Sequence, residues 1–444
     1  MRRARSERGI AVLVVLVVIA IGALAGTVAL LAARSASEGA SVSANRVQSR
    51  LTMRSGVLIL QQESIAQREA VLGGADFELD VPFEVFTQGE RSGVFRLDAT
   101  LTETPVSLDA LLDVNTADAT MLAGLPGLDE TIAGAIVAKL PVRSLGELLG
   151  VEGVTVELLY GEYDDSGRLI SDMPPLASLL TVGSVDPSFT IGVGSIESAT
   201  EQVDVSGEFD QAVVDRAREL VGPQEGGAAL ATVLGEGRQR PKTRADLAQA
   251  LRSAGQSLVT SGQIIDGVCF GAEPARGRVD INRAPLEVLA VLPGLDAESA
   301  EAIVDARRSL APEQLCDPLW PLREGLVDES DMVKLLDRVT TRSVRWVLRA
   351  EAGMSAADRE RSVGVDSIED VQRIRAGMAA AQDDRLSDRV AMDLLVDFSG
   401  SKPAVVPLGE VSIAGELAVV ARALGGGERI EDEDAMAQAP GVGP

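Results

Sequence analysis

Histidine is absent from the 444-residue chain, and cysteine occurs only twice, at Cys269 and Cys316. Without histidine the chain lacks the commonest general base and zinc ligand, which excludes Ser-His-Asp and Cys-His catalytic arrangements. The two cysteines form no CxxC motif, so a thioredoxin-like site or a cysteine-rich metal cluster is excluded as well. In an oxidising compartment they are a candidate disulfide, and otherwise they are two buried thiols; the sequence leaves both open.

Positive charge is also scarce, because 41 Lys and Arg residues face 67 Asp and Glu residues, a formal net charge of −26. A chain this acidic repels phosphate backbones, but it attracts divalent cations or basic partners. Carboxylate pairs can act as acid and base catalysts, yet so many acids form pairs by chance. We therefore expect no enzymatic activity. With 46% apolar residues, the chain is long enough for two or three domains with real cores.

The N-terminal segment pairs a basic stretch with a long apolar run. Residues 1–9 contain four arginines, and no charge occurs in the 24 residues from Ile10 to Ala33. At ~1.5 Å per residue the run measures about 36 Å as a helix, enough to cross a hydrocarbon core of ~30 Å. The basic flank favours a cytoplasmic N-terminus, which places the chain after Arg34 on the other side of the membrane.

Three interpretations fit this segment. A secretory signal would use residues 10–21 as its apolar core and end after residues 23–25, whereas an uncleaved anchor would keep the whole run. The third depends on Gly9, which directly precedes the run. Residues 8–10 (Arg-Gly-Ile) resemble a class III, prepilin-type leader, in which prepilin peptidase cuts after the glycine. That resemblance implies cleavage between Gly9 and Ile10, with the apolar run kept as the membrane anchor.

The fifth mature position departs from the usual pilin pattern. Pilins carry a glutamate there, which neutralises the N-terminal amine of the neighbouring subunit, but this chain has Val14. A subunit without the glutamate fits the end of a filament. The chain thereby resembles the K subunit (GspK-like) of the type II secretion pseudopilins, a large minor pseudopilin at the tip. The resemblance implies a single-pass inner-membrane protein with a periplasmic bulk, whose partners are other minor pseudopilins and secretion-machine components.

After Arg34 the chain is predicted to continue as one helix, so that residues 10–72 form a transmembrane and stem helix, with a stalk or coiled coil as the alternative. Two sets of residues recur at helical spacing on separate faces: Val47, Leu51, Leu58 and Ile65, and Arg46, Arg50 and Arg54. Within the following region, 73–108, residues 77–85 and 94–101 predict a small β-hairpin laid on the stem.

An internal repeat is the most specific pattern in the chain. Residues 113–129 (DVNTADATMLAGLPGLD) are matched by residues 280–296 (DINRAPLEVLAVLPGLD) at a constant offset of 167 residues. Each copy predicts two helices joined by a Leu-Pro-Gly-Leu turn, whose glycine supplies a backbone angle that other residues avoid. Asn115 and Asn282 are expected to cap the first helices, and Asp118 is expected to complete the capping in copy one.

The two hairpins resemble helix-hairpin-helix or SAM-like modules, which elsewhere bind DNA phosphate through the amides of a Pro-Gly-x-Gly turn. Here an aspartate replaces the second glycine, and its charge opposes phosphate binding. The turn residues are Pro126, Gly127 and Asp129, and Pro293, Gly294 and Asp296. We therefore expect protein-facing or structural modules at 109–161 and 276–338, with a membrane-anchored DNA receptor as the alternative. The K pseudopilins carry a similar all-helical domain, followed by a strand like the one expected after Val339.

An acidic loop between the repeats is a candidate calcium site. Oxygen-bearing side chains alternate along residues 162–173 and glycine is sixth, as in an EF-hand loop. The twelfth residue, Met173, cannot act as a bidentate ligand, so a plain acidic turn is the alternative. Calcium is known in the pseudopilins, so the resemblance makes Ca²⁺ a candidate ligand of this loop. The candidate ligands are Glu162, Asp164, Ser166 and Asp172.

Overall the sequence predicts an α+β fold, in which a long N-terminal transmembrane helix and a pilin-like small sheet precede helical modules in the exported head. Residues 162–275 are predicted to be an α/β insertion, with strands at 179–193 and 201–208, a loop at 223–227 and helices at 228–234 and 244–251. Residues 339–424 form a C-terminal α/β region with strands or helices at 390–398 and 407–424. The glycine-rich and acidic tail, 425–444, is predicted to be disordered.

Overall fold

The computed structural model describes residues 3–79, 82–88, 91–97, 105–162, 169–171, 173–190, 199–207, 210–221, 225–271, 274–356 and 386–410. It mixes helices and sheet, as the α+β prediction requires. The chain divides into two compact units. Unit 1 comprises Met1–Gly56, Pro82–Arg96 and Glu351–Val390, and unit 2 comprises Val57–Val81, Leu97–Ala350 and Ala391–Pro444.

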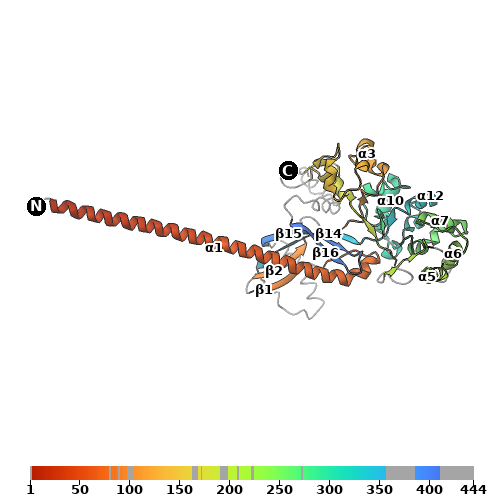
Figure 1. The fold of residues 1–444 in the computed structure, drawn as a ribbon, viewed down its shortest axis with the longest axis horizontal. Helices are drawn as coiled ribbons and strands as arrows, with labels where there is room; N and C mark the ends of the chain where they lie inside the picture. Colours follow the sequence, from red (N-terminus) through yellow and green to blue (C-terminus); the bar gives the residue numbers. More distant parts are fainter. Residues whose placement is uncertain are drawn as a thin grey trace, which may run out of the picture. The chain divides into compact units, whose positions relative to one another are not determined.

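The N-terminal helix α1 (Arg3–Leu72) runs without a break (Figure 1). This confirms the prediction that the apolar run and the stem form one helix that ends at Leu72. The segment holds no proline, and Gly39 and Gly56 do not interrupt the helix, because a single glycine costs only about 1 kcal/mol. Gly74 then takes a φ of 105°, a left-handed angle that suits glycine and ends the helix.

In unit 1 a β-hairpin packs on α1. Strands β1 (Phe83–Gln88) and β2 (Arg91–Leu97) pair antiparallel, with Phe83 opposite Phe95. Phe95 is completely buried, and a Cβ added at Gly56 of α1 would overlap with its ring. The hairpin laid on the stem was thus predicted, but its first strand was placed too early. Phe77 belongs to no strand; in unit 2 its ring lies 5.1 Å from that of Phe398.

The principal sheet has the order β1-β2-β14-β15-β16, with β3 also pairing with β14. Its other strands are β3 (Val106–Ser107), β14 (Arg345–Ala356), β15 (Ser387–Asp397) and β16 (Ala404–Glu410). Of the strand or helix predicted at 390–398, the structure has the strand, β15, and the strand expected after Val339 is present. The segment predicted at 407–424 is a strand as far as Glu410, whereas the rest of it and the tail 425–444 lie outside the described residues.

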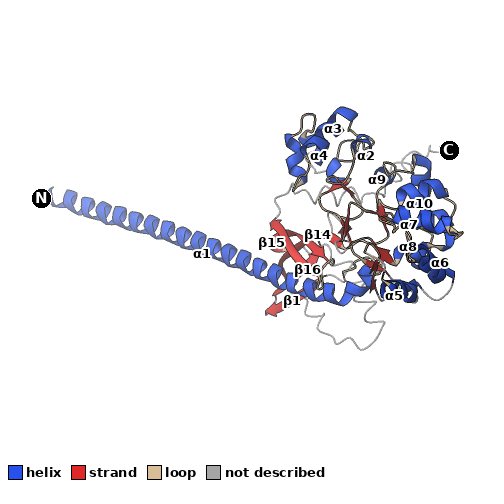
Figure 2. Cartoon of the chain, turned by 45° about the vertical axis from the view of Figure 1, so that its right-hand side comes forward, coloured by secondary structure: helices blue, strands red, loops and turns tan. Residues whose placement is uncertain are grey.

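Both copies of the repeat begin with a short strand and two helices and end with a short strand (Figure 2). Copy one contains β4 (Leu112–Asp113), α2 (Ala119–Ala123), α3 (Glu130–Lys139), η1 (Leu145–Gly150), α4 (Val156–Tyr160), η2 (Leu176–Ser178) and β5 (Leu180–Thr181). Copy two contains β12 (Val279–Asp280), α9 (Leu286–Leu289), α10 (Ala297–Arg307), η4 (Pro312–Gln314), α11 (Trp320–Arg323), α12 (Glu329–Leu335) and β13 (Val339–Thr340). In each copy the first strand pairs in parallel with the last, so the helices form the crossover between them.

The longest elements between the copies are helices, and the described residues of the strands predicted at 179–193 and 201–208 form no long strand. They form short strands of two residues: β5, β6 (Val185–Asp186), β7 (Phe189–Thr190), β8 (Thr200–Glu201) and β9 (Val203–Asp204). The remaining elements are α5 (Gln211–Val221), α6 (Glu225–Val233), α7 (Arg244–Ser253), η3 (Leu258–Thr260), α8 (Gly262–Asp266), β10 (Val268–Cys269) and β11 (Ala275–Arg276). Helix α6 begins inside the predicted loop 223–227, whereas the helices predicted at 228–234 and 244–251 correspond to α6 and α7.

One hydrophobic core holds the two copies and the segment between them together. Its buried residues include Leu122 and Ile136 of copy one, Leu251 of α7, and Ile303 and Trp320 of copy two. Because these side chains belong to a single cluster, neither copy buries its apolar surface alone.

The close contact between Gly56 and Phe95 yields a test of the hairpin packing. Gly56→Leu is expected to push β1 and β2 off α1, because overpacking typically costs about 1–3 kcal/mol. Hydrogen–deuterium exchange should then become faster in peptides that cover 82–97. The same change at Gly39, where an added Cβ meets nothing within 4 Å, should leave these peptides unchanged. Equal exchange in both variants would show that the hairpin does not pack on Gly56.

Candidate functional site

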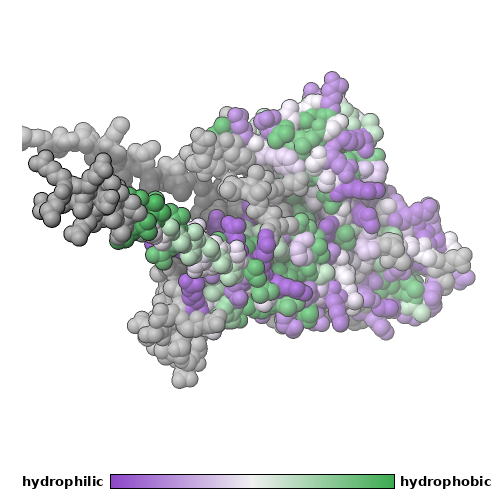
Figure 3. Space-filling model, turned by 60° about the vertical axis from the view of Figure 1, so that its left-hand side comes forward, coloured by the Kyte–Doolittle hydropathy of each residue, from purple (hydrophilic) through white to green (hydrophobic). Residues whose placement is uncertain are grey.

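The first part of α1 exposes an unbroken apolar surface. Between Leu16 and Leu31 its large hydrophobic side chains are exposed, with fractions such as 67% for Leu24 and 74% for Leu30. Figure 3 shows hydrophobic side chains along this part of the helix. By length and composition, α1 is the one helix among the described residues that can cross a membrane. The first charged residues after the apolar run are Arg34 and Glu38, which form an ion pair at 2.8 Å.

Further along α1, two faces of the helix differ in burial. Met53 and Leu60 are buried, whereas the side chains of the predicted apolar set are exposed. That set, Val47, Leu51, Leu58 and Ile65, recurs at spacings of four and seven residues and therefore forms one stripe along the helix. The stripe lies opposite the buried face and remains available for contact with another helix.

Within unit 2, an aspartate at the start of each copy, Asp113 or Asp280, accepts hydrogen bonds from corresponding positions of that copy. Asp113 accepts a bond from the Asn115 amide and Asp280 accepts one from the Asn282 amide, both at 3.0 Å. The second carboxylate oxygen of each aspartate holds a serine after the closing strand. Ser184 donates its amide to Asp113 at 2.9 Å, and Ser343 donates its hydroxyl to Asp280 at 2.5 Å. Each aspartate therefore ties the beginning of its copy to the end.

Asn115 and Asn282 are not helix caps, contrary to the prediction. Asp118 caps α2 through its side chain, and Pro285 stands at the start of α9. The asparagines instead bind chain segments beyond the second helix. Asn115 exchanges two hydrogen bonds with the backbone of Val142, and Asn282 accepts one from the Trp320 indole at 2.9 Å. Their role is to fix the loops that close each copy.

Asp109 joins the two copies. One carboxylate oxygen accepts the amide of Val185, at 3.2 Å, and the other accepts the amides of Val344 and Arg345, at 2.7 and 2.9 Å. Val185 and Val344 occupy equivalent positions, each directly after the serine that follows a closing strand. The backbone carbonyl of Asp109 also accepts the amide of Asp280, at 2.8 Å. Burial raises the pKa of the Asp109 carboxyl to about 7, although the three amides and Arg345 lower it.

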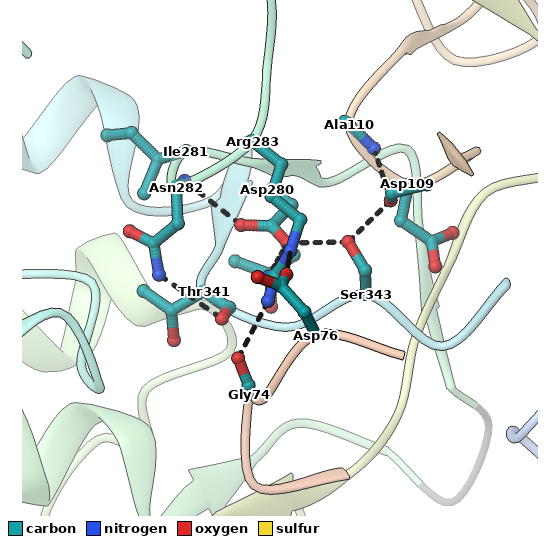
Figure 4. Close-up of polar contacts among 12 residues, drawn as sticks. Gly74, Asp76, Asp109, Ala110, Asp280, Ile281, Asn282, Arg283, Thr341 and Ser343 are labelled. Carbon is teal, nitrogen blue, oxygen red and sulfur yellow. Dashed lines mark hydrogen bonds and ion pairs between the residues drawn. The ribbon is translucent and has the colours of Figure 1, made fainter. Parts of the chain in front are cut away.

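Arg283 connects copy two with the segment that follows α1 (Figure 4). Its guanidinium bonds the carboxylates of Asp280 at 2.6 Å and Asp76 at 2.7 Å, and the carbonyl of Gly74 at 2.8 Å. It also lies over the Trp346 ring, 5.3 Å from the centroid. Burial lowers the pKa of Arg283, but the two carboxylates outweigh burial and the net direction is upwards. The guanidinium of Arg283 thereby binds the residues that directly follow α1.

Three more buried ion pairs involve the insertion. Arg342, just after the second copy, binds Asp266 of α8 through two hydrogen bonds. Asp186 of β6 binds Arg278 at 2.5 Å, and within the insertion it also binds Arg244 at 3.4 Å. Burial raises the pKa of Asp186, but the positive charges of the arginines outweigh burial and the net shift is downwards. These charges are paired in fixed geometry, as buried charges must be, and they indicate a structural role.

The hairpin turns lie where the sequence placed them. Gly127 and Gly294 take φ angles of 80° and 88°, and Asp129 and Asp296 cap the second helices by accepting an amide at 2.8 Å in each copy. A carboxylate thus already uses the helix amides that would attract a phosphate. Each turn glycine is also covered by the helix that closes its copy, through Leu158 in copy one and Asp331 in copy two.

The calcium and disulfide predictions have different outcomes. Glu162 is exposed, whereas Asp164, Ser166 and Asp172 lie outside the described residues, so the calcium site stays a prediction. In the part of the chain that is described, no three His, Cys, Asp or Glu side chains are grouped to hold a metal. Cys269 and Cys316 are both free thiols, half-buried and not joined to each other. Burial and nearby Asp317 raise the pKa of Cys316 to about 11.

The sequence patterns predicted no role for Asp109 or Arg283, nor for the buried Arg244 and Arg342. One signal was available, since Thr-x-x-Ser-Val occurs at 181–185 and again at 340–344, at the exit of each copy. Comparison of the chain with models of protein families found no match, and comparison with curated proteins found none either.

The raised pKa of Asp109 predicts how stability depends on pH. Between the ordinary value of 3.8 and about 7 the folded state retains a proton that the unfolded state has lost. The free energy of unfolding therefore falls as pH rises through this window, by up to about 1.4 kcal/mol per pH unit from this group. Urea unfolding of the full chain in detergent, followed by the fluorescence of buried Trp320 and Trp346, measures the slope.

Asp109→Asn supplies the control for this prediction. The variant is expected to be less stable at low pH by about 1–3 kcal/mol, because its amide nitrogen faces a backbone N–H. The difference between wild type and variant should shrink as pH rises from 4 to 7. A constant difference would show that Asp109 is ionised throughout the range.

Proposed function

We propose that the chain is a membrane-anchored structural subunit of a pilin-like filament, of the minor pseudopilin K type found at the tip of the type II secretion pseudopilus. Its work is to support protein export across the outer membrane, without chemistry of its own. The observation that carries the proposal is α1, a single helix whose large apolar side chains are exposed from Leu16 to Leu31 and whose second part has a buried face and an exposed apolar stripe. Anchored helices that associate sideways need both surfaces.

Two features of the sequence support a position at the filament tip. Val14 stands where pilins carry the glutamate that contacts the subunit ahead, so no such contact is needed. The head after the stem is large, and it contains buried ion pairs such as Arg342–Asp266 and Arg349–Asp393, as suits a rigid structural part. In this proposal residues 1–9 are removed, the apolar run lies in the inner membrane, and the remainder faces the periplasm beside other minor pseudopilins and secretion-machine components.

The mature N-terminus tests the proposal directly. When the chain is produced together with a prepilin peptidase, intact-mass spectrometry is expected to show a protein that begins at Ile10 and still fractionates with membranes. Gly9→Leu should abolish the cut, because the peptidase reads the glycine at the boundary. Gly22→Leu, a matched change inside the same run, should leave it in place. A mature chain that begins at Gly26 would identify an ordinary secretory signal and contradict the proposal.

A membrane-anchored DNA receptor is the second candidate, and the geometry of the turns opposes it. Asp129 and Asp296 occupy the amides at the starts of α3 and α10, and the net charge of −26 repels a duplex. Tight binding of duplex DNA that weakens steeply with added salt is the result that would favour this candidate. The arrangement of the described residues offers no comparable support for it.

A further inference from the structure

The hairpin turns of the two copies differ in the side chains that surround them. Helices α4 and α12 occupy the same place, because Thr155 and Asp328 both cap them and each accepts the amide three residues later. Leu158 in copy one therefore corresponds to Asp331 in copy two. The Leu158 side chain lies against its turn glycine, whereas Asp331 approaches Gly294 through its backbone carbonyl. The same position is apolar in one copy and charged in the other.

In copy two the charged residues find partners within the chain. Asp331 pairs with Lys334 at 2.6 Å, and Glu329, at the first position of α12, pairs with Arg252 of α7 at 3.4 Å. Helices α7 and α12 also pack together. At this end of copy two, Asp331 and Glu329 therefore both have ion-pair partners within the chain.

In copy one the same end is apolar and open. Leu158 and Met173 both approach Gly127 at the turn. Met173 is 49% exposed and Ile170, three residues before it, is 53% exposed. We call Gly127, Leu158, Ile170 and Met173 the copy-one turn surface. The half-buried Leu158 stands where copy two has Asp331, and together with the exposed Ile170 and Met173 it forms an apolar surface that indicates a contact with something outside the chain.

Carboxylates border the copy-one turn surface. Asp129, Glu130, Glu157 and Glu162 are all exposed, and the capping hydrogen bonds near Thr155 lower the pKa of Glu157. Residues 125–131 and 155–162 contain no Lys or Arg, whereas the loop before Ile170 holds Arg168, outside the described residues, together with Asp164 and Asp165. A partner with apolar side chains between basic ones would match both the surface and its border.

We propose that the copy-one turn surface binds an amphipathic, basic segment of another protein, whose apolar side chains lie on Leu158, Ile170 and Met173 while Lys or Arg residues reach the surrounding carboxylates. A second molecule of this protein does not suit the site. Each whole chain carries a net charge of −26, so a second chain would bring carboxylates of the same charge to the border of the surface. The proposal is independent of membrane anchoring, so it can fail while the proposed function stands.

The test places a photo-crosslinker on the surface in the full chain, in detergent, after Cys269 and Cys316 are changed to serine. A benzophenone maleimide is attached through Met173→Cys in one variant and through Val259→Cys in a matched control, since Val259 is 40% exposed on η3. The probe is a short synthetic peptide of leucine and lysine at helical spacing. A second peptide carries glutamate in place of lysine.

We expect the lysine peptide to crosslink about tenfold more at position 173 than at position 259, and the glutamate peptide at neither position. Adding Ile170→Glu should abolish the preference for position 173. This change increases the negative charge, so it would strengthen purely electrostatic binding; a loss therefore reports the apolar contact. Equal yields at both positions, insensitivity to Ile170→Glu, or crosslinks mainly between two copies of the chain would each overturn the proposal.

Discussion

The head of this protein depends on one buried carboxylate. Asp109 accepts amide hydrogen bonds from Val185 and Val344, which follow the closing strands of the two repeats, and its own carbonyl accepts the amide of Asp280. An aspartate at this point satisfies several backbone donors that would otherwise be buried without partners. The two copies are thereby fixed to each other at their exits, and their apolar faces merge into one core.

A series of buried contacts leads from Asp109 to the residues that follow α1. Asp280 closes copy two and also holds Arg283, which binds Asp76 and the carbonyl of Gly74 just after α1. The contact connects the residues just after a long helix to the repeat through charge-assisted hydrogen bonds, which are shorter and stronger than neutral ones. These acids therefore serve the structure.

The sequence predicted those parts of the fold that local chemistry decides. The end of α1 at Leu72 could be predicted from Gly73 and Gly74. The turns at Gly127 and Gly294 could be predicted from Leu-Pro-Gly-Leu, because glycine readily adopts the positive φ angles found at Gly74, Gly127 and Gly294. The contacts of Asp109 span 76 and 235 residues of sequence, so no local pattern reveals them. Asn115 was misread as a cap for the same reason, since its partner Val142 lies 27 residues away. The two-residue strands between the copies are set by tertiary pairing, which periodicity cannot detect.

We propose that α1 crosses a membrane and leaves the head outside the cytoplasm. The most direct test of this proposal is the accessibility of Ser37→Cys, just beyond the apolar run, in a chain without Cys269 and Cys316. In intact bacterial spheroplasts a membrane-impermeant maleimide should label this cysteine, and the labelled chain should stay in the membrane after an alkaline wash. A cysteine that reacts only after the cells are opened, or a labelled chain released by the wash, would contradict the account.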